Sequence, residues 1–95
     1  MKLVSIVRSP TEDKKYRAVF RTDDGQIKNT DFGLKHASDY LDHQDLARRN
    51  RYRQRHAKDL NTNDPTRAGY LSYYISWNLP TMEASIRDYK RRFNL

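Results

Sequence analysis

The chain has 95 residues, a formal net charge of +7 and no cysteine. A chain of this length supports one small hydrophobic core, and without cysteine no disulfide or thiolate-metal site can stabilise it, so packed apolar and aromatic side chains must do so. We therefore expect a single domain over residues 1–95. No stretch approaches the roughly 20 apolar residues that a membrane-spanning helix needs, and no membrane span is expected.

The positive charge is confined to the second half of the chain. Residues 1–45 contain eight basic and eight acidic side chains, whereas residues 46–95 contain eleven basic and four acidic ones. Five of the basic residues are arginines that fall within the eight positions 48–55. We therefore expect a polyanionic partner to meet the second half of the chain.

Residues 1–33 are expected to form a β-meander. Leu3–Val7 is apolar and rich in β-branched side chains, and residues 16–21 alternate between two faces. Asp23-Asp24-Gly25 separates this second run from Gln26–Phe32 and predicts a hairpin, because glycine readily adopts the positive φ of a tight turn. The pattern predicts three antiparallel strands whose core-facing side chains on the middle strand are Tyr16, Ala18 and Phe20.

Residues 34–95 are expected to be helical. Ser38 can cap a short turn, and Asp42 with Asp45 resembles a capping box at the start of an arginine-rich helix that reaches Leu60. Asp64-Pro65 predicts the start of a second, hydrophobic helix, in which Gly69 permits close approach. We therefore expect the α+β class: a small three-stranded antiparallel sheet followed by three helices, with the arginine-rich helix as a charged outer layer.

The third helix is capped by Thr81. Its apolar side chains recur at spacings of four, three and four residues, in the order Met82, Ile86, Tyr89 and Phe93. This spacing predicts a helix that packs one face on the sheet and exposes basic residues on the other. Trp77 and Phe93 are expected in the core, because large aromatic side chains contribute most when buried.

The arginine-rich helix is expected to have two faces. Projected at about 100° per residue, one side carries Leu46, Asn50, Ala57 and Leu60 with Arg53 among them, so we expect Arg53 to find a carbonyl or acidic partner within the fold. The opposite side stays available. Together with the basic face of the last helix, the expected partner-binding residues are Arg48, Arg49, Arg51, Tyr52, Arg55, Lys58, Arg87, Lys90 and Arg91.

No motif predicts catalysis or a metal site. His36, His43 and His56 are seven and thirteen residues apart, which is not the spacing of a zinc-binding helix. The chain has no cysteine nucleophile, no glycine-flanked serine elbow and no glycine-rich phosphate loop. The three acids at positions 39, 42 and 45 fit helix caps. We therefore expect no catalytic residue, no metal, no cofactor and a non-enzymatic function.

Three motifs in the C-terminal third, with some upstream positions, carry a family resemblance. They are Asn63–Ser72, Trp77–Thr81 and Ala84–Phe93, and the upstream positions Phe32-Gly33, Ser38–Tyr40 and His43–His56 fit the same pattern. Over about residues 30–95 the chain resembles a family of short basic proteins of uncharacterised function from nucleocytoplasmic large DNA viruses. The resemblance implies a viral protein packaged in the virion, and it supplies no catalytic residues.

Two functions fit these observations, beside the interpretation of the arginines as a solvated or internally paired face. The first is a virion structural protein, a minor capsid or cement component, whose Arg/Tyr face binds acidic patches of neighbouring coat subunits. The alternative is a DNA-binding or genome-condensing virion protein that uses the same face on phosphates, without a base-reading motif. Both place the protein in the virion and, during assembly, in the host cytoplasm or nucleus.

Overall fold

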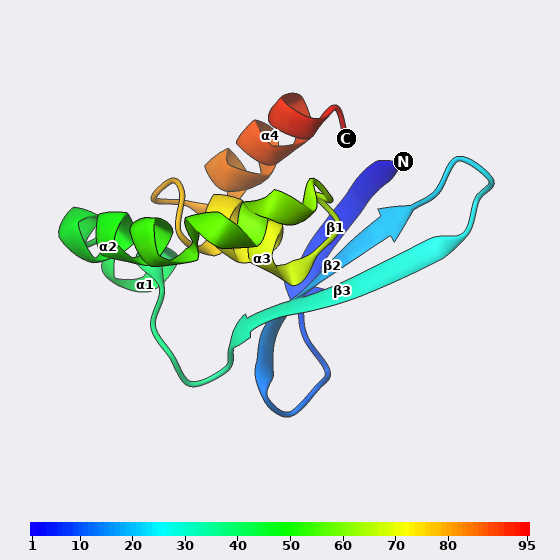
Figure 1. Cartoon of the computed structure of the whole chain (residues 1–95). Helices are drawn as coiled ribbons and strands as arrows, with labels where there is room; N and C mark the ends of the chain where they lie inside the picture. The colour runs from blue at the N-terminus through cyan, green and yellow to red at the C-terminus, as the bar shows by residue number, and fades with distance from the viewer.

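The computed structural model describes residues 1–95 and has an α+β fold (Figure 1). Strands β1 (Lys2–Arg8), β2 (Lys14–Arg21) and β3 (Ile27–Leu34) form an antiparallel sheet in the order β1-β2-β3. Gly25, with φ +87°, lies in the hairpin between β2 and β3. The expected three-stranded meander is confirmed, and the strand ends differ from the expected ones by at most two residues.

The helical part follows the sheet, as the sequence predicts, but it is divided more finely. Two of its α-helices are single turns, so the chain has four α-helices rather than three. The segments are α1 (Tyr40–His43), α2 (Leu46–His56), the 3-10 helix η1 (Ala57–Thr62), α3 (Ala68–Leu71), the π-helical turn η2 (Ser72–Ser76) and α4 (Met82–Phe93).

The capping box lies one turn earlier than expected. Asp39, and not Ser38, caps α1, and it forms the box with Asp42. Gln44 then takes a left-handed conformation with φ 54°, which ends α1. Asp45 begins α2 by itself, since its carboxylate accepts the Arg48 N–H at 3.2 Å. The same three aspartates thus start two helices instead of one.

The second expected helix start, at Asp64-Pro65, is wrong by one turn. The Asp64 carboxylate accepts hydrogen bonds from both the N–H and the hydroxyl of Thr66, at 3.0 and 2.7 Å. An aspartate that bonds locally in this way stabilises a turn in place of a helix. The helix α3 therefore begins only at Ala68. The cap at Thr81 is confirmed, because its hydroxyl accepts the Ala84 N–H at 3.2 Å.

The core lies between the sheet and the helical segments that follow α2. Ala18 and Phe20 of β2 and Phe32 of β3 are fully buried against the helical layer, whose own buried members are Tyr70, Leu71, Ile75 and Tyr89. Tyr16 packs against this cluster, so the expected inward face of β2 is confirmed. The helices cover only one face of the sheet (Figure 1). The two chain ends lie side by side, and the Leu3 N–H donates to the Leu95 carbonyl.

Candidate functional site

Helix α2 has eleven residues and none of them is buried. Its docking face is made of long polar and aromatic side chains at spacings of three and four residues, namely Arg49, Tyr52, Arg53 and His56, which are the partly buried members of the helix. The expected aliphatic stripe is wrong, since Leu46 is 57% exposed and Asn50 and Ala57 face solvent. Only Leu60, beyond the end of α2, packs on the core.

Aromatic stacking sets the rotation of α2. The Tyr52 ring lies on the Trp77 ring, with centroids 4.4 Å apart and planes 7° from parallel, and it stacks on His56 at 4.1 Å. Trp77 follows the π-helical turn η2, where its N–H donates to the Ser72 carbonyl at 3.0 Å. Trp77 is therefore outside the buried core cluster, contrary to expectation, and serves as the platform on which α2 packs. Burial raises the pKa of Tyr52.

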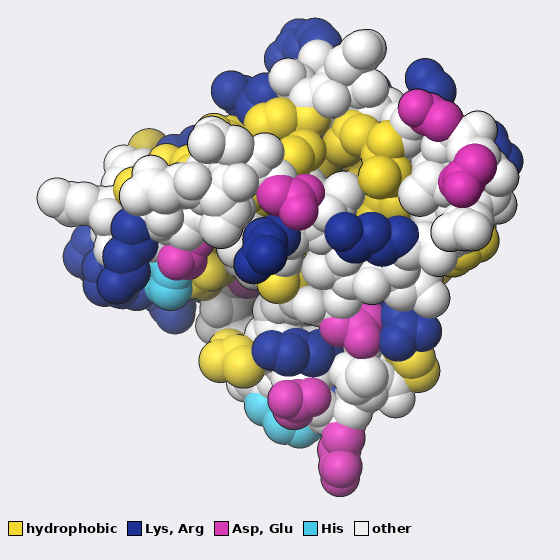
Figure 2. Space-filling model, turned by 45° about the vertical axis from the view of Figure 1, so that its right-hand side comes forward, with side chains coloured by type: hydrophobic (Ala, Val, Ile, Leu, Met, Phe, Trp, Pro, Cys, Tyr) yellow, Lys and Arg dark blue, Asp and Glu magenta, His cyan; other side chains and the backbone are white.

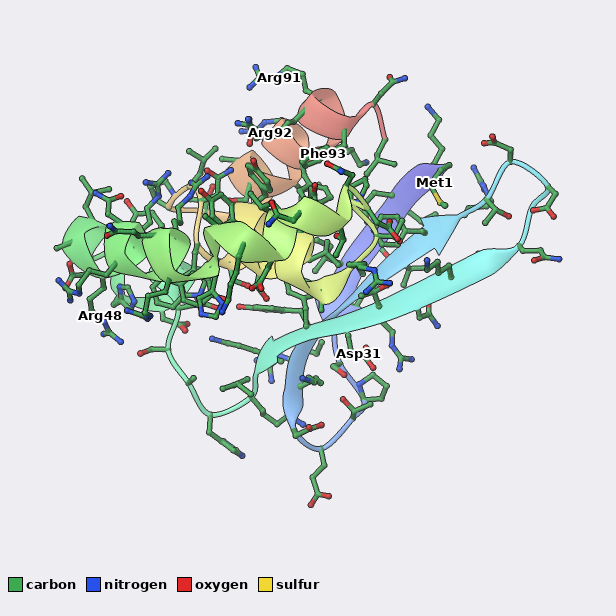
Figure 3. All side chains as sticks on the ribbon, in the orientation of Figure 1. Met1, Asp31, Arg48, Arg91, Arg92 and Phe93 are labelled. Carbon is green, nitrogen blue, oxygen red and sulfur yellow. The ribbon has the colours of Figure 1, made fainter.

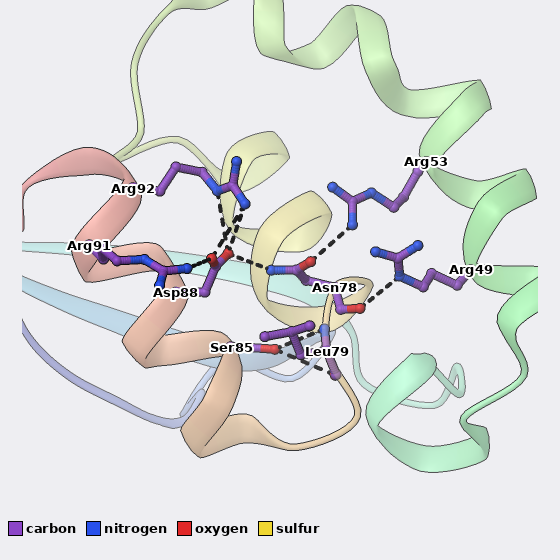
Figure 4. A network of polar contacts seen from close by, with 8 residues as sticks. All are labelled: Arg49, Arg53, Asn78, Leu79, Ser85, Asp88, Arg91 and Arg92. Atoms are coloured by element: carbon purple, nitrogen blue, oxygen red, sulfur yellow. Dashed lines mark hydrogen bonds and ion pairs between the residues drawn. The ribbon is translucent and has the colours of Figure 1, made fainter.

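Two arginines of α2 meet the C-terminal helix through one asparagine (Figure 4). Arg49 donates to the Asn78 main-chain carbonyl at 2.7 Å, and Arg53 donates to the Asn78 side-chain oxygen at 3.0 Å. The carbonyl-type partner expected for Arg53 is thus present, and Arg53 also lies 4.1 Å from the Tyr73 ring centroid. Arg49 was expected to be free for a partner, but it is used inside the fold. Burial, with Arg53 nearby, lowers the pKa of Arg49.

Asp88 anchors the other end of this network. Its carboxylate accepts the Asn78 side-chain N–H at 2.8 Å and is bonded by Arg91 and Arg92 of the same helix. Burial opposes ionisation of Asp88, but the hydrogen bonds from Asn78 and Arg91 and the charge of Arg92 hold the pKa of the carboxyl below its usual value. Arg92 also lies over the Tyr74 ring, 4.8 Å from its centroid. Asp88 therefore compensates part of the positive charge of Arg91 and Arg92.

Four cations of α2 and η1 stay outside this network. They are exposed and take part in none of the ion pairs of the chain: Arg48, Arg51, Arg55 and Lys58. Their spacing of three, four and three residues aligns them along one side of the helical segment, so we call them the cationic row. Figure 3 shows Arg48 projecting on the side of α2 that faces the β3–α1 connection. In Figure 2, Lys and Arg side chains gather at the left of the molecule, the side on which α2 lies in Figure 1.

The basic residues of α4 form a separate group. Arg87 and Lys90 are exposed, while Arg91 is held by Asp88 at 2.9 Å although its side chain is 82% exposed. Figure 3 places Arg91 and Arg92 on the opposite side of the helical layer from Arg48. The structure therefore uses Arg49 and Tyr52 inside the fold and divides the other expected partner-binding residues into two surfaces, of which only the cationic row is a continuous unpaired set.

The acids at the start of the helical part are engaged by a lysine from the sheet. Lys15 of β2 donates to Asp39 at 3.2 Å and also to Asp42. Burial raises the pKa of Asp39, whereas the hydrogen bond from Lys15 lowers the pKa of Asp42. These carboxylates hold α1 against the sheet. No group of three or more His, Asp or Glu side chains lies close enough together to hold a metal ion.

A cavity of about 340 Å³ opens beside the stacked rings of Tyr52 and Trp77. Its wall combines the start of β2, the C-terminal end of β3 with the connection to α1, α2 with η1, and α3 with η2. This cavity was not predicted from the sequence. A usable signal was the spacing of Tyr52, His56 and Asp59, which places all three on one side of the helical segment.

The sequence profile of a family of unknown function, DUF5754, matches residues 4–56. This span is more than half of the chain and runs from β1 to the end of α2, so it includes the arginines of the cationic row and excludes those of α4. Comparison with curated proteins and with solved structures found no match. None of the helices is both long enough and apolar enough to cross a membrane.

Proposed function

We propose that this chain, which belongs to the DUF5754 family of unknown function, binds nucleic acid through phosphate contacts of the cationic row, without enzymatic activity. The observation that carries the proposal is the arrangement of Arg48, Arg51, Arg55 and Lys58 as an exposed row without an acidic partner. No acidic residue interrupts α2 between Leu46 and His56. Such a row releases counterions when it meets phosphates, which favours binding.

The placement of the aromatic residues supports phosphate as the partner over an acidic protein surface. Protein interfaces draw much of their affinity from buried arginine and tyrosine anchors. Tyr52, the tyrosine within the arginine run, stacks on Trp77 and His56 and is partly buried. The cationic row is left with flexible charged ends, which suit a partner of regularly spaced negative charges.

The experiment is a salt titration of affinity with fluorescently labelled duplex DNA, measured by anisotropy. For the intact chain, the logarithm of the association constant should fall linearly with the logarithm of salt concentration. In the double variant Arg51→Gln/Arg55→Gln, the slope should become shallower by about 1.8, since each phosphate contact on B-DNA contributes about 0.9.

The control removes the same charge from the sheet. Arg8 and Arg21 are exposed on β1 and β2, and no side-chain ion pair involves them. The double variant Arg8→Gln/Arg21→Gln should keep the slope of the unmodified chain. An affinity that does not change between low and moderate salt, or an equal loss of slope in both double variants, would overturn the proposal.

A second candidate is a virion structural protein, a minor capsid or cement component in contact with coat subunits. The observation that favours it is the uncovered face of the sheet (Figure 1). Val7 and Ile27 are 47% and 58% exposed and pair with Arg17 and Arg21 of β2, which alternate with the core-facing residues. A neighbouring subunit would cover these apolar side chains, while the basic residues meet its acidic patches.

This second candidate also takes up the viral resemblance, and it has its own test. Purified particles of the source virus should contain the chain, and chemical cross-links from Lys2 on the sheet should reach coat protein. Particles that lack the chain by mass spectrometry would remove the candidate.

A further inference from the structure

The cavity beside Tyr52 and Trp77 has the size and the lining of a small-ligand site. Its volume of about 340 Å³ lies near the lower end of the range of roughly 300–1,000 Å³ that such sites occupy. Flat rings form part of the wall, because Tyr52, His56 and Trp77 all line it, and Tyr52 stacks on both of the others. A planar aromatic ligand would find ring faces or edges of the same kind as its own.

Ser76, a residue of the cavity wall, has a hydroxyl group without a partner. Ser76 is 2% exposed, and its Oγ is buried without any hydrogen-bond partner in the chain. A buried polar atom without a partner costs about 1–3 kcal/mol, so its presence calls for a partner from outside the chain. Ser76 belongs to the π-helical turn η2, a distortion that occurs frequently at functional sites.

The charges inside the cavity exclude phosphate and favour a hydrogen-bond donor. Two carboxylates, Asp39 and Asp59, line it, against one amine from Lys14. Asp39 is already bonded by Lys15 and Tyr16. Asp59 uses only Oδ2, which lies 3.0 Å from His56 Nδ1, so its second oxygen stays available as an acceptor. An amino group on a planar ring would donate to it, as bases do to acidic side chains.

The unpaired arginines of α2 lie outside the cavity, where a phosphate would have to be. Arg48 and Arg55 are four and three residues from Tyr52 and therefore flank it on the helix surface. A second, open hollow of about 780 Å³ adjoins the cavity, since Asp59, Ala68 and Gly69 line both. Its cations are Lys28, Lys58 and Arg67. This order, with phosphate sites outside and a planar pocket inside, is that of one nucleotide on a strand.

We propose that the cavity takes up one unstacked, amino-bearing nucleobase of a single strand, while the cationic row and the adjoining hollow hold the flanking phosphates. This inference rests on the proposed nucleic-acid binding and adds to it a base-binding pocket. The base lies beside the rings of Trp77 and Tyr52, and its amino group donates to Asp59, with Ser76 Oγ as a second partner. Cytosine and adenine carry such an amino group and thymine does not.

The test uses the single tryptophan of the chain as a reporter. Oligonucleotides of about twelve nucleotides, oligo(dC), oligo(dA) and oligo(dT), are long enough to fill a single-strand site. Anisotropy of a labelled strand reports binding by any route, whereas quenching of Trp77 emission reports a base in the cavity. We expect quenching with oligo(dC) and oligo(dA), weaker quenching with oligo(dT), and weaker binding of a duplex of the same length.

Two variants separate the pocket from the phosphate contacts. Ser76→Ala removes the hydroxyl, so oligo(dC) affinity should fall about three- to tenfold, while the thermal midpoint stays equal or rises because an unpartnered polar atom is gone. Ala37→Leu, at an exposed position that lines the cavity and not the adjoining hollow, narrows the cavity and should reduce quenching while salt-dependent anisotropy persists. Ser5→Ala on β1 is the matched control and should change neither signal.

The outcomes distinguish the two proposals. Salt-dependent binding without any quenching of Trp77, and with Ser76→Ala and Ala37→Leu indistinguishable from the unmodified chain, would overturn the pocket and leave phosphate binding in place. The absence of binding to every strand and duplex would overturn both. Equal quenching by all three oligonucleotides would overturn the role of the amino group.

Discussion

Tyr52 of α2 lies flat on Trp77, with the two ring planes 7° from parallel. This contact fixes which side of the arginine-rich helix faces the protein. Arg49 and Arg53 are turned toward Asn78, and the cationic row is turned to solvent. The function that we propose depends on this rotation, because the same sequence rotated by half a turn would bury the row.

Replacing Tyr52 with alanine should loosen α2. The loss of ring burial and of stacking should lower the free energy of unfolding by about 2 kcal/mol, of which stacking contributes about 0.5–1.5 kcal/mol. Chemical denaturation followed by Trp77 emission measures both the stability and the exposure of the platform. Tyr52→Phe keeps the stacked ring and should remain within about 0.5 kcal/mol of the unmodified chain. Equal stability of the alanine variant would show that the stack does not hold α2.

Replacing Asn78 with alanine should disconnect α2 from α4. The buried carboxylate of Asp88 loses the amide that it accepts, and Arg53 loses its oxygen partner, so we expect a loss of about 2–3 kcal/mol. Amide hydrogen exchange should then be faster in α2 than in the sheet. The control is Asn61→Ala in the exposed part of η1, which should change little. Similar losses in the two variants would contradict the bridging role of Asn78.

Asp88 should make stability depend on pH in the acid range. Its pKa is lower in the folded chain than the value of about 3.9 for unfolded aspartate, so its contribution is complete above that value and is lost as pH falls through the folded pKa. Asp88→Asn should cost about 1–3 kcal/mol at pH 7. The difference between the two proteins, measured by urea denaturation, should shrink below about pH 4. A difference that stays constant to pH 2.5 would contradict the assigned role.

Gly69 should not accept a side chain. A Cβ added there would lie 2.9 Å from the Asp59 Cβ, so the close approach expected from the sequence is confirmed. Gly69→Ala should cost about 1–3 kcal/mol, as overpacking does.

Gly25 differs, because nothing lies within 4 Å of an added Cβ but its φ is +87°. Asparagine tolerates such a φ, so Gly25→Asn should be milder than Gly25→Ala, while Gly69→Asn should be at least as harmful as Gly69→Ala. The thermal midpoints of the four variants test this order of stability.

The sheet and the last helix could be predicted because their signals are local. Alternation along β2, the turn at Gly25 and the cap at Thr81 each depend on residues near one another in the chain. The helix starts at Asp45 and Ala68 were displaced by a turn, because several adjacent aspartates can each cap, and Asp64 forms a turn instead.

The rotation of α2 could not be predicted, because its partners lie far away in sequence. The amphipathic rule assigns Leu46 to the inner side, yet Trp77, Asn78 and, through Asn78, Asp88 present an aromatic ring and hydrogen-bonding groups that suit tyrosine and arginine better. Contacts with Trp77 and Asn78 therefore determine the rotation of α2 more strongly than a narrow aliphatic stripe does. The cavity escapes prediction for the same reason, since its walls come from four separate parts of the chain.

The central claim is that a nucleic-acid strand lies along the cationic row and reaches the cavity. The most direct measurement is the mapping of amide chemical-shift changes in the labelled protein on addition of oligo(dC) of about twelve nucleotides, a length within known single-strand site sizes. The account predicts the largest changes in residues 48–59 and 68–77, together with the indole N–H of Trp77. Changes confined to the outer face of the sheet or to Arg87 and Lys90 of α4, with α2 unaffected, would contradict it.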